Sequence, residues 1–185
     1  MNITRFLNDR GFSSFEGNCQ TCPPQVHDLL HITRGAKRIM EIGFNAGHSS
    51  EIFLKYTSAH VTSFDLGDHP YVAHAKEYID VYYPGRHSLI LGDSTVTVPQ
   101  YNGTFDVIFI DGGHDYAVAL ADLQNCRRLA HPGTIVIMDD TMYTPAWVHP
   151  YTVGPTKVWV ESDMMEMGRR DYTNGKGMSW GKYKL

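Results

Sequence analysis

Five short apolar runs are the feature that most constrains the fold, because amphipathic segments of helical periodicity separate them. These runs, which we expect to be strands, span residues 38–42, 60–65, 88–91, 105–110 and 134–138. The segment 116–130, for example, repeats apolar residues at the spacing of a helix. Nearly continuous apolar strands that alternate with amphipathic helices predict a parallel sheet covered by helices on both faces.

Acidic residues follow or end each of these predicted strands. They are Glu41, Asp65, Asp93, Asp111 and the pair Asp139-Asp140. In parallel α/β sheets, ligands bind outside the carboxyl ends of the strands. We therefore expect the acidic side chains to converge on one ligand-binding edge of the sheet.

The pattern changes after residue 140. A loop is expected over 141–155, a helix over 156–165, and then a hairpin with strands at 169–173 and 178–183 around Asn174-Gly175. A terminal antiparallel pair is unlike a plain dinucleotide-binding domain.

The chain of 185 residues has the size of one domain. We expect residues 1–22 to form an irregular segment or lid and residues 23–185 to form the ligand-binding domain. Cys19 and Cys22 form one Cys-x-x-Cys pair without a second pair, which is poor support for zinc. This segment more naturally covers a cofactor.

Composition excludes several classes of partner. The net charge of −4 and the absence of a basic stripe argue against nucleic acid, and no apolar run is long enough to span a membrane. Three cysteines favour a reducing compartment over a disulfide framework, so we expect a cytoplasmic protein. The sequence leaves self-association into a homo-oligomer open.

The stretch from Glu41 to Ser49 reads as a strand end, a tight turn and a helix start. Gly43 and Gly47 would let the backbone pass close to a ligand. A carboxylate at this position suits hydroxyl or ammonium groups better than a phosphate. The loop therefore predicts a nucleoside-like ligand.

Several motifs lie in or next to the predicted strands and helices: Glu-Ile-Gly-Phe-Asn-Ala-Gly-His-Ser at 41–49, Phe-Ile-Asp-Gly-Gly-His-Asp-Tyr at 109–116, Asp122-Leu123, His-Pro-Gly-Thr at 131–134 and Met-Asp-Asp at 138–140. Together they resemble the motifs of the class I S-adenosylmethionine-dependent methyltransferases. Within this class, the chain is most similar to the metal-dependent O-methyltransferases of the catechol and caffeoyl-CoA type and of the bacterial sugar type. The resemblance implies a Rossmann-like three-layer α/β sandwich, whose seven-stranded, mostly parallel sheet has a reversed strand in its C-terminal hairpin.

The resemblance also implies which residues hold S-adenosylmethionine. Glu41, Gly43 and Gly47 would line the floor beneath the amino-acid tail and the ribose, and Asp65, followed by Leu66, would accept the ribose hydroxyls. The remaining predicted cofactor residues are Asn45, His48 and Ser49 for the tail carboxylate, Gly92, Asp93 and Ser94 for the adenine, and Asp111.

The chemistry is expected at Asp111, His114, Asp139 and Asp140. Three carboxylates, from Asp111, Asp139 and Asp140, would hold Mg²⁺ or another hard divalent cation. His114 and Asp111 are the predicted catalytic residues, with His114 as the base for an acceptor hydroxyl. The catechol-type pattern ends in Asp-Asn, whereas this chain has Asp-Asp, as in the sugar-type enzymes.

The resulting hypothesis is a metal-assisted O-methyltransferase that acts on a hydroxyl of a small phenol, catechol or sugar. A nicotinamide-dependent oxidoreductase is a second interpretation, although residues 43–47 lack the three-glycine spacing of the dinucleotide fingerprint. A non-catalytic cofactor-binding module is a third.

Overall fold

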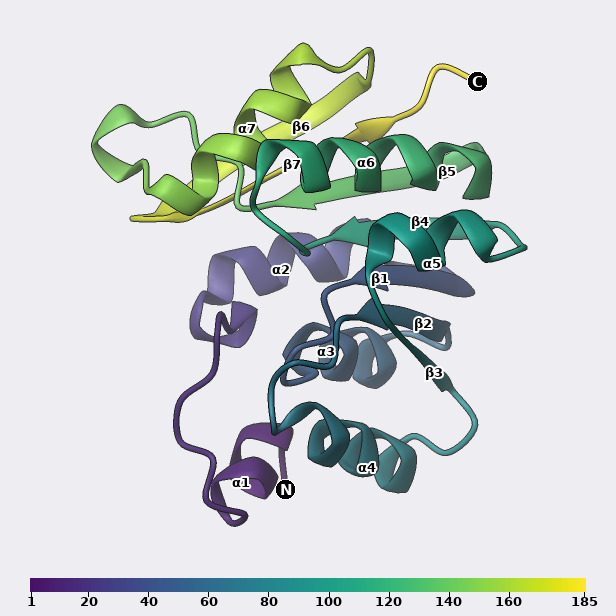
Figure 1. Ribbon diagram of the computed structural model, residues 1–185, viewed down its shortest axis with the longest axis vertical. Helices are drawn as coiled ribbons and strands as arrows, with labels where there is room; N and C mark the ends of the chain where they lie inside the picture. The colour runs from purple at the N-terminus through teal and green to yellow at the C-terminus, as the bar shows by residue number, and fades with distance from the viewer.

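A seven-stranded sheet forms the centre of the computed structural model, which describes residues 1–185 (Figure 1). The strand order is β3-β2-β1-β4-β5-β7-β6. The strands are β1 (Arg38–Ile42), β2 (His60–Asp65), β3 (His87–Leu91), β4 (Phe105–Ile110), β5 (Ala130–Asp139), β6 (Met165–Thr173) and β7 (Lys176–Lys182). β1 to β5 run parallel, and β7 lies antiparallel to both β5 and β6. The predicted fold class is confirmed.

Helices cover both faces of this sheet. One layer contains α1 (Ile3–Asn8), α2 (Pro23–Ile32), α3 (His48–Tyr56) and α4 (Val72–Tyr82), and the other contains α5 (Ser94–Gln100), α6 (Tyr116–Cys126) and α7 (Pro150–Glu161). Short 3₁₀ turns lie at Cys19–Thr21, Arg127–Leu129 and Pro145–Trp147. Each layer buries its own apolar cluster, with Phe53 and Phe109 in the first and Leu123 and Trp159 in the second.

Strand register brings the predicted carboxylates to one edge. Ile110 of β4 lies beside Met138 of β5, so the next residues, Asp111 and Asp139, are neighbours. The amide of Asp111 also donates to the carbonyl of Ile42 at 2.9 Å, which holds the ends of β1 and β4 together.

The boundaries around β5 differ from those that the sequence predicted. The helix expected over 116–130 ends at Cys126 and continues as a 3₁₀ turn. β5 begins at Ala130, so Pro132-Gly133 lies inside this strand and not in a separate turn. The register between β4 and β5 shifts from Phe105 to Val107, and this irregularity accommodates the proline in the strand.

The helix predicted at 156–165 is misplaced. α7 begins at Pro150, because proline fits the first turn of a helix and the Thr152 hydroxyl accepts the His149 amide at 3.1 Å. β6 therefore starts at Met165, and the hairpin is longer than expected, although its turn is at Asn174-Gly175 as predicted.

The N-terminal segment is part of the folded core. Ile3 and Leu7 of α1 are fully buried against the layer that contains α3 and α4. Glu51 of α3 accepts hydrogen bonds from the Ile3 amide at 3.1 Å, from Gln20 at 2.8 Å and from the Tyr78 hydroxyl at 2.6 Å. This buried carboxylate ties the first 22 residues to the helices beneath them. None of the helices has the length and apolar character needed to cross a membrane.

Candidate active site

The two glycines of the loop after β1 allow close approach of other chain segments. Gly43 has φ +95°, and a Cβ there would lie 1.9 Å from the Asp111 carbonyl oxygen. Gly47, the left-handed residue before α3, would bring a Cβ to 2.8 Å from Ile3 Cδ1. Both positions therefore require glycine for packing as well as for backbone conformation.

Glu41 points into the protein. Its carboxylate is fully buried and accepts hydrogen bonds from Ser49, from Ser50 at 2.5 Å and from Ser63 at 2.6 Å. Burial raises the pKa of Glu41 to about 7, against the opposing effect of the three serine hydroxyls. The Ser49 hydroxyl and the Glu41 carboxylate thus bond to each other, and the cofactor contacts predicted for these two residues stay predictions.

His48 is also directed inward. Its Nε2 lies 3.0 Å from the Thr4 hydroxyl, and its ring packs edge-on against Phe15. Burial lowers the pKa of His48 to about 4, so the imidazole is neutral at pH 7. The His48 side chain thus joins α3 to the N-terminal segment, and its contact with the cofactor tail stays a prediction.

Asp65 retains the character of a ribose-binding residue. Its two carboxylate oxygens accept the amides of Asn45 at 2.8 Å and Gly67 at 2.7 Å, and each oxygen has a further lone pair available. The side chain is half-buried, and Leu66 beside it is exposed. The Asn45 side chain is occupied, since it donates to the Glu16 carbonyl. The position thus fits a diol.

The loop after β3 contains Gly92, Asp93 and Ser94. Asp93 caps α5 by accepting the amide of Thr95 at 2.8 Å and its hydroxyl at 2.7 Å, and these bonds lower the pKa of Asp93. Near Ser94 lies Asp122 of α6, which is buried with both carboxylate oxygens unpartnered. Burial raises the pKa of Asp122 to about 6.

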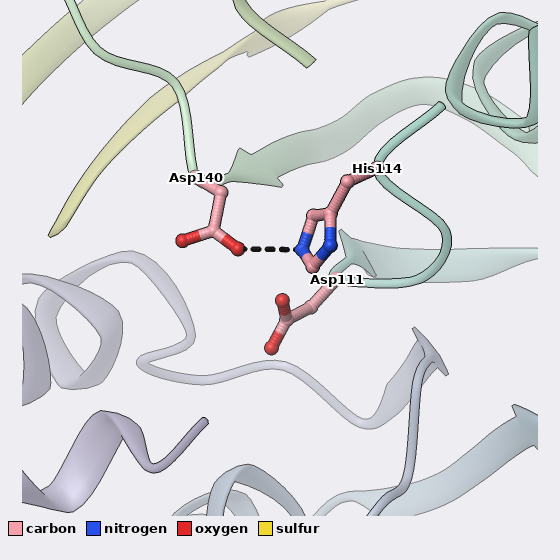
Figure 2. A group of neighbouring side chains, drawn as sticks. All are labelled: Asp111, His114 and Asp140. Atoms are coloured by element: carbon pink, nitrogen blue, oxygen red, sulfur yellow. Dashed lines mark hydrogen bonds and ion pairs between the residues drawn. The ribbon is translucent and has the colours of Figure 1, made fainter. Parts of the chain in front are cut away.

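Asp111, His114 and Asp140 face a common space at the ends of β4 and β5 (Figure 2). One ligand atom from each of the three lies within 4.8 Å of the others. His114 Nε2 and Asp140 Oδ2 are 2.8 Å apart, and this hydrogen bond raises the pKa of His114. Burial and the neighbouring carboxylates of Asp139 and Asp140 raise the pKa of Asp111. A set of two carboxylates and one imidazole can bind a divalent cation or move a proton.

Asp139 lies outside this cluster, although the sequence grouped it with Asp111 and Asp140 as a metal ligand. It is buried, and its Oδ1 accepts a hydrogen bond from Gln25 Nε2 at 2.7 Å. Burial, followed by the charge of Asp140, raises the pKa of Asp139 to about 8. Asp140 has φ +56°, a left-handed backbone that is uncommon outside glycine and that occurs preferentially at functional sites. The structure thus groups Asp111 and Asp140 with His114.

Sequence reasoning missed two residues near this cluster. Gln25 of α2 holds Asp139, and Lys176 of β7 donates from Nζ to the Asn18 carbonyl at 3.2 Å. Gln25 lies in the segment before the first strand, where the sequence predicts no site residue. Nothing in the local sequence indicates that Lys176 returns to the same edge of the sheet.

Comparison with known proteins agrees with this geometry. Residues 40–141 match the family model described as a methyltransferase domain. This match covers more than half of the chain, and the chain belongs to that family. Its fold is that of the class I S-adenosylmethionine-dependent methyltransferases. No curated protein matches the sequence.

Solved structures share the fold at low sequence identity. An O-methyltransferase from Bacillus cereus in complex with S-adenosylhomocysteine has a TM-score of 0.75 at 17% identity, covering 98% of this chain and 89% of that one. TomG from Streptomyces achromogenes, an O-methyltransferase involved in tomaymycin synthesis and solved with S-adenosylmethionine, has a TM-score of 0.72 at 17% identity, with coverages of 98% and 88%. A ribosomal protein L11 methylase from Lactobacillus delbrueckii subsp. bulgaricus has a TM-score of 0.67 at 14% identity, with coverages of 91% and 82%. Neighbours with such different acceptors show that the fold leaves the acceptor undetermined.

Proposed function

We propose that this protein is an S-adenosylmethionine-dependent O-methyltransferase that acts on a hydroxyl group of a small molecule, a phenol, catechol or sugar. The observation that carries the proposal is the convergence of Asp111, His114 and Asp140 at the ligand-binding edge of a methyltransferase sheet. An imidazole bonded to a carboxylate suits the removal of a hydroxyl proton near neutral pH.

The residues of this chain fit the cofactor at its ribose. Asp65 accepts two amides and has lone pairs left for a diol, and the exposed Leu66 beside it offers apolar surface to an adenine. S-Adenosylmethionine, when bound, supplies an electrophilic methyl group on a sulfonium. The protein holds donor and acceptor so that the two meet in line, which is the main source of acceleration in a reaction of two bound molecules.

His114 takes the proton of the acceptor hydroxyl, and Asp140 orients the imidazole and stabilises its charged form. With S-adenosylmethionine held at Asp65, the deprotonated acceptor oxygen would take the methyl group, and S-adenosylhomocysteine would be the leaving group. The proton leaves His114 to solvent after transfer. No covalent bond to the protein forms at any stage.

The same cluster fits a divalent cation, because Asp111 and Asp140 offer carboxylate oxygens and their mutual repulsion favours a bound positive charge. Such an ion supplies Lewis-acid activation of the acceptor hydroxyl. With an ion bound, His114 either remains the base or becomes the third ligand of the ion.

Methyl transfer from radiolabelled S-adenosylmethionine to panels of phenols, catechols and sugars, with Mg²⁺ or with EDTA, tests the proposal. We expect the wild type to turn over at least one of these acceptors. His114→Ala should lower this turnover by about 10²-fold or more, which is typical of losing a positioned base. The affinity for S-adenosylhomocysteine should remain nearly unchanged. Mn²⁺ binding, measured by electron paramagnetic resonance, separates the two roles of His114. If His114 acts as the base, His114→Ala should bind Mn²⁺ as tightly as the wild type. If His114 is a metal ligand, the variant should bind Mn²⁺ more weakly.

His131→Ala is the matched control. His131 also pairs with an aspartate, Asp106 at 3.2 Å, but at the opposite end of β4 and β5. This variant should retain full turnover. Thermal stabilisation by NAD and not by S-adenosylhomocysteine would favour an oxidoreductase and contradict the proposal. Cofactor binding without transfer to any acceptor would favour a non-catalytic module.

A further inference from the structure

Lys176 lies near enough to Asp111 and Asp139 for its charge to oppose the rise in the pKa of both carboxyls, and neither the fold nor the proposed chemistry assigns it a role. It is the first residue of β7, two residues before the part of this strand that pairs with β5. Met178, two residues further on, lies opposite Asp139 and is buried on the face covered by α1 to α4. Because side chains alternate along a strand, Lys176 points to the same face as Met178.

The ammonium group of Lys176 is not neutralised by an ion pair. No carboxylate oxygen lies within 4.0 Å of it, and its hydrogen bond to the Asn18 carbonyl uses one of three donors. The two arginines of the adjacent strand β6 differ in this respect, since Arg169 lies 3.7 Å from Glu166 and Arg170 lies 3.1 Å from Asp28. Lys176 is half-buried and still reachable.

Tyr151 of α7 lies between the proposed base and the β6–β7 turn. The centroid of its ring lies 5.5 Å from that of His114. Its hydroxyl donates to the carbonyl of Gly175, the residue before Lys176, at 3.0 Å. One exposed aromatic side chain thus extends from the imidazole to the β6–β7 turn.

We propose that Lys176 binds a carboxylate on the acceptor, so that the protein methylates hydroxy acids: the ring packs along Tyr151, the hydroxyl faces His114 and the carboxylate meets Lys176. This inference rests on the proposed function and gives its acceptor a chemical class. A cation reserved for the acceptor explains why an unpaired ammonium persists next to several aspartates, where a salt bridge would otherwise be expected.

Matched acceptors that differ only in charge test the proposal. One pair is 3,4-dihydroxybenzoate and 3,4-dihydroxybenzamide, and a second is glucuronate and glucuronamide. In the wild-type protein, we expect KM for the acid of the productive pair to be about tenfold below KM for its neutral partner, as for one charge-assisted hydrogen bond. Lys176→Met should abolish this ratio with little change in kcat, and Lys176→Arg should restore most of it.

Lys182→Met is the control, since Lys182 lies on the same strand but at its far end, opposite Met165. It should keep the wild-type ratio. Equal acid-to-neutral ratios in wild type and Lys176→Met would overturn the inference while leaving the methyltransferase proposal intact.

Absence of turnover with all four compounds, despite binding of S-adenosylhomocysteine, would instead count against the proposed acceptor chemistry. Calorimetric titration of 3,4-dihydroxybenzoate and of glucuronate into the protein loaded with S-adenosylhomocysteine then tests Lys176 directly. Binding of either acid that weakens about tenfold in Lys176→Met supports the inference. Affinities that do not change, or no binding of either acid, refute it.

Discussion

Glu41 should make the stability of this protein fall as the pH rises. Its carboxylate is fully buried, and burial raises its pKa from the ordinary value of 4.5 to about 7. Between these two values the native state holds a proton that the unfolded chain has released. The contribution of Glu41 to stability is therefore fully present below pH 4.5 and is lost as the pH rises through 7. The pKa difference corresponds to about 3 kcal/mol.

Urea unfolding between pH 4.5 and pH 8 measures this effect, with Glu41→Gln as the test variant. Glutamine imitates the protonated acid, so the variant should lack about 3 kcal/mol of the decline seen in the wild type. Asp111 and Asp139 also have raised pKa values and contribute a decline in both proteins. Because the charge of Glu41 ranks below burial, Asp139 and Asp140 among the causes at Asp111, the difference removes most of this decline. Glu77→Gln, at a half-exposed side chain paired with Arg10 on the surface, is the control and should follow the wild type. Parallel stability curves for wild type and Glu41→Gln would refute the reasoning.

Three further predictions concern the site and its supports. Gly154→Ala would place a Cβ 2.0 Å from the His114 carbonyl oxygen; displacement of the His114 loop should lower stability by about 1–3 kcal/mol in urea and reduce turnover in the same preparation. Glu51→Ala leaves the Ile3 amide and the other buried donors to Glu51 unpaired, so we expect the free energy of unfolding to fall by about 3 kcal/mol and the first 22 residues to be cleaved faster by protease. Unchanged cleavage would contradict this role of Glu51. Asp65→Asn should weaken S-adenosylhomocysteine binding about tenfold in calorimetry with little change in melting temperature, and equal affinity would remove Asp65 from the cofactor site.

The sequence by itself determined the architecture. Apolar runs of strand length, alternating with helical periodicity, specify a parallel sheet because both kinds of element must bury an apolar face. The acidic strand ends could be assigned to one edge from topology alone, and Asn174-Gly175 identified the hairpin turn because few sequences adopt its backbone conformation. These features depend on local spacing, which is visible in a single chain.

The tertiary structure decided where each polar side chain points. Glu41 points inward because three serines from two elements donate hydrogen bonds to it. Asp139 lies outside the cluster of Asp140 because it accepts a hydrogen bond from Gln25 of α2. Partners such as Lys176 arrive from more than 30 positions away along the chain, where no periodic pattern connects them to the site. Strand ends can be placed from sequence because backbone topology is repetitive, whereas the direction of a buried carboxylate depends on which distant donors packing brings within hydrogen-bonding distance.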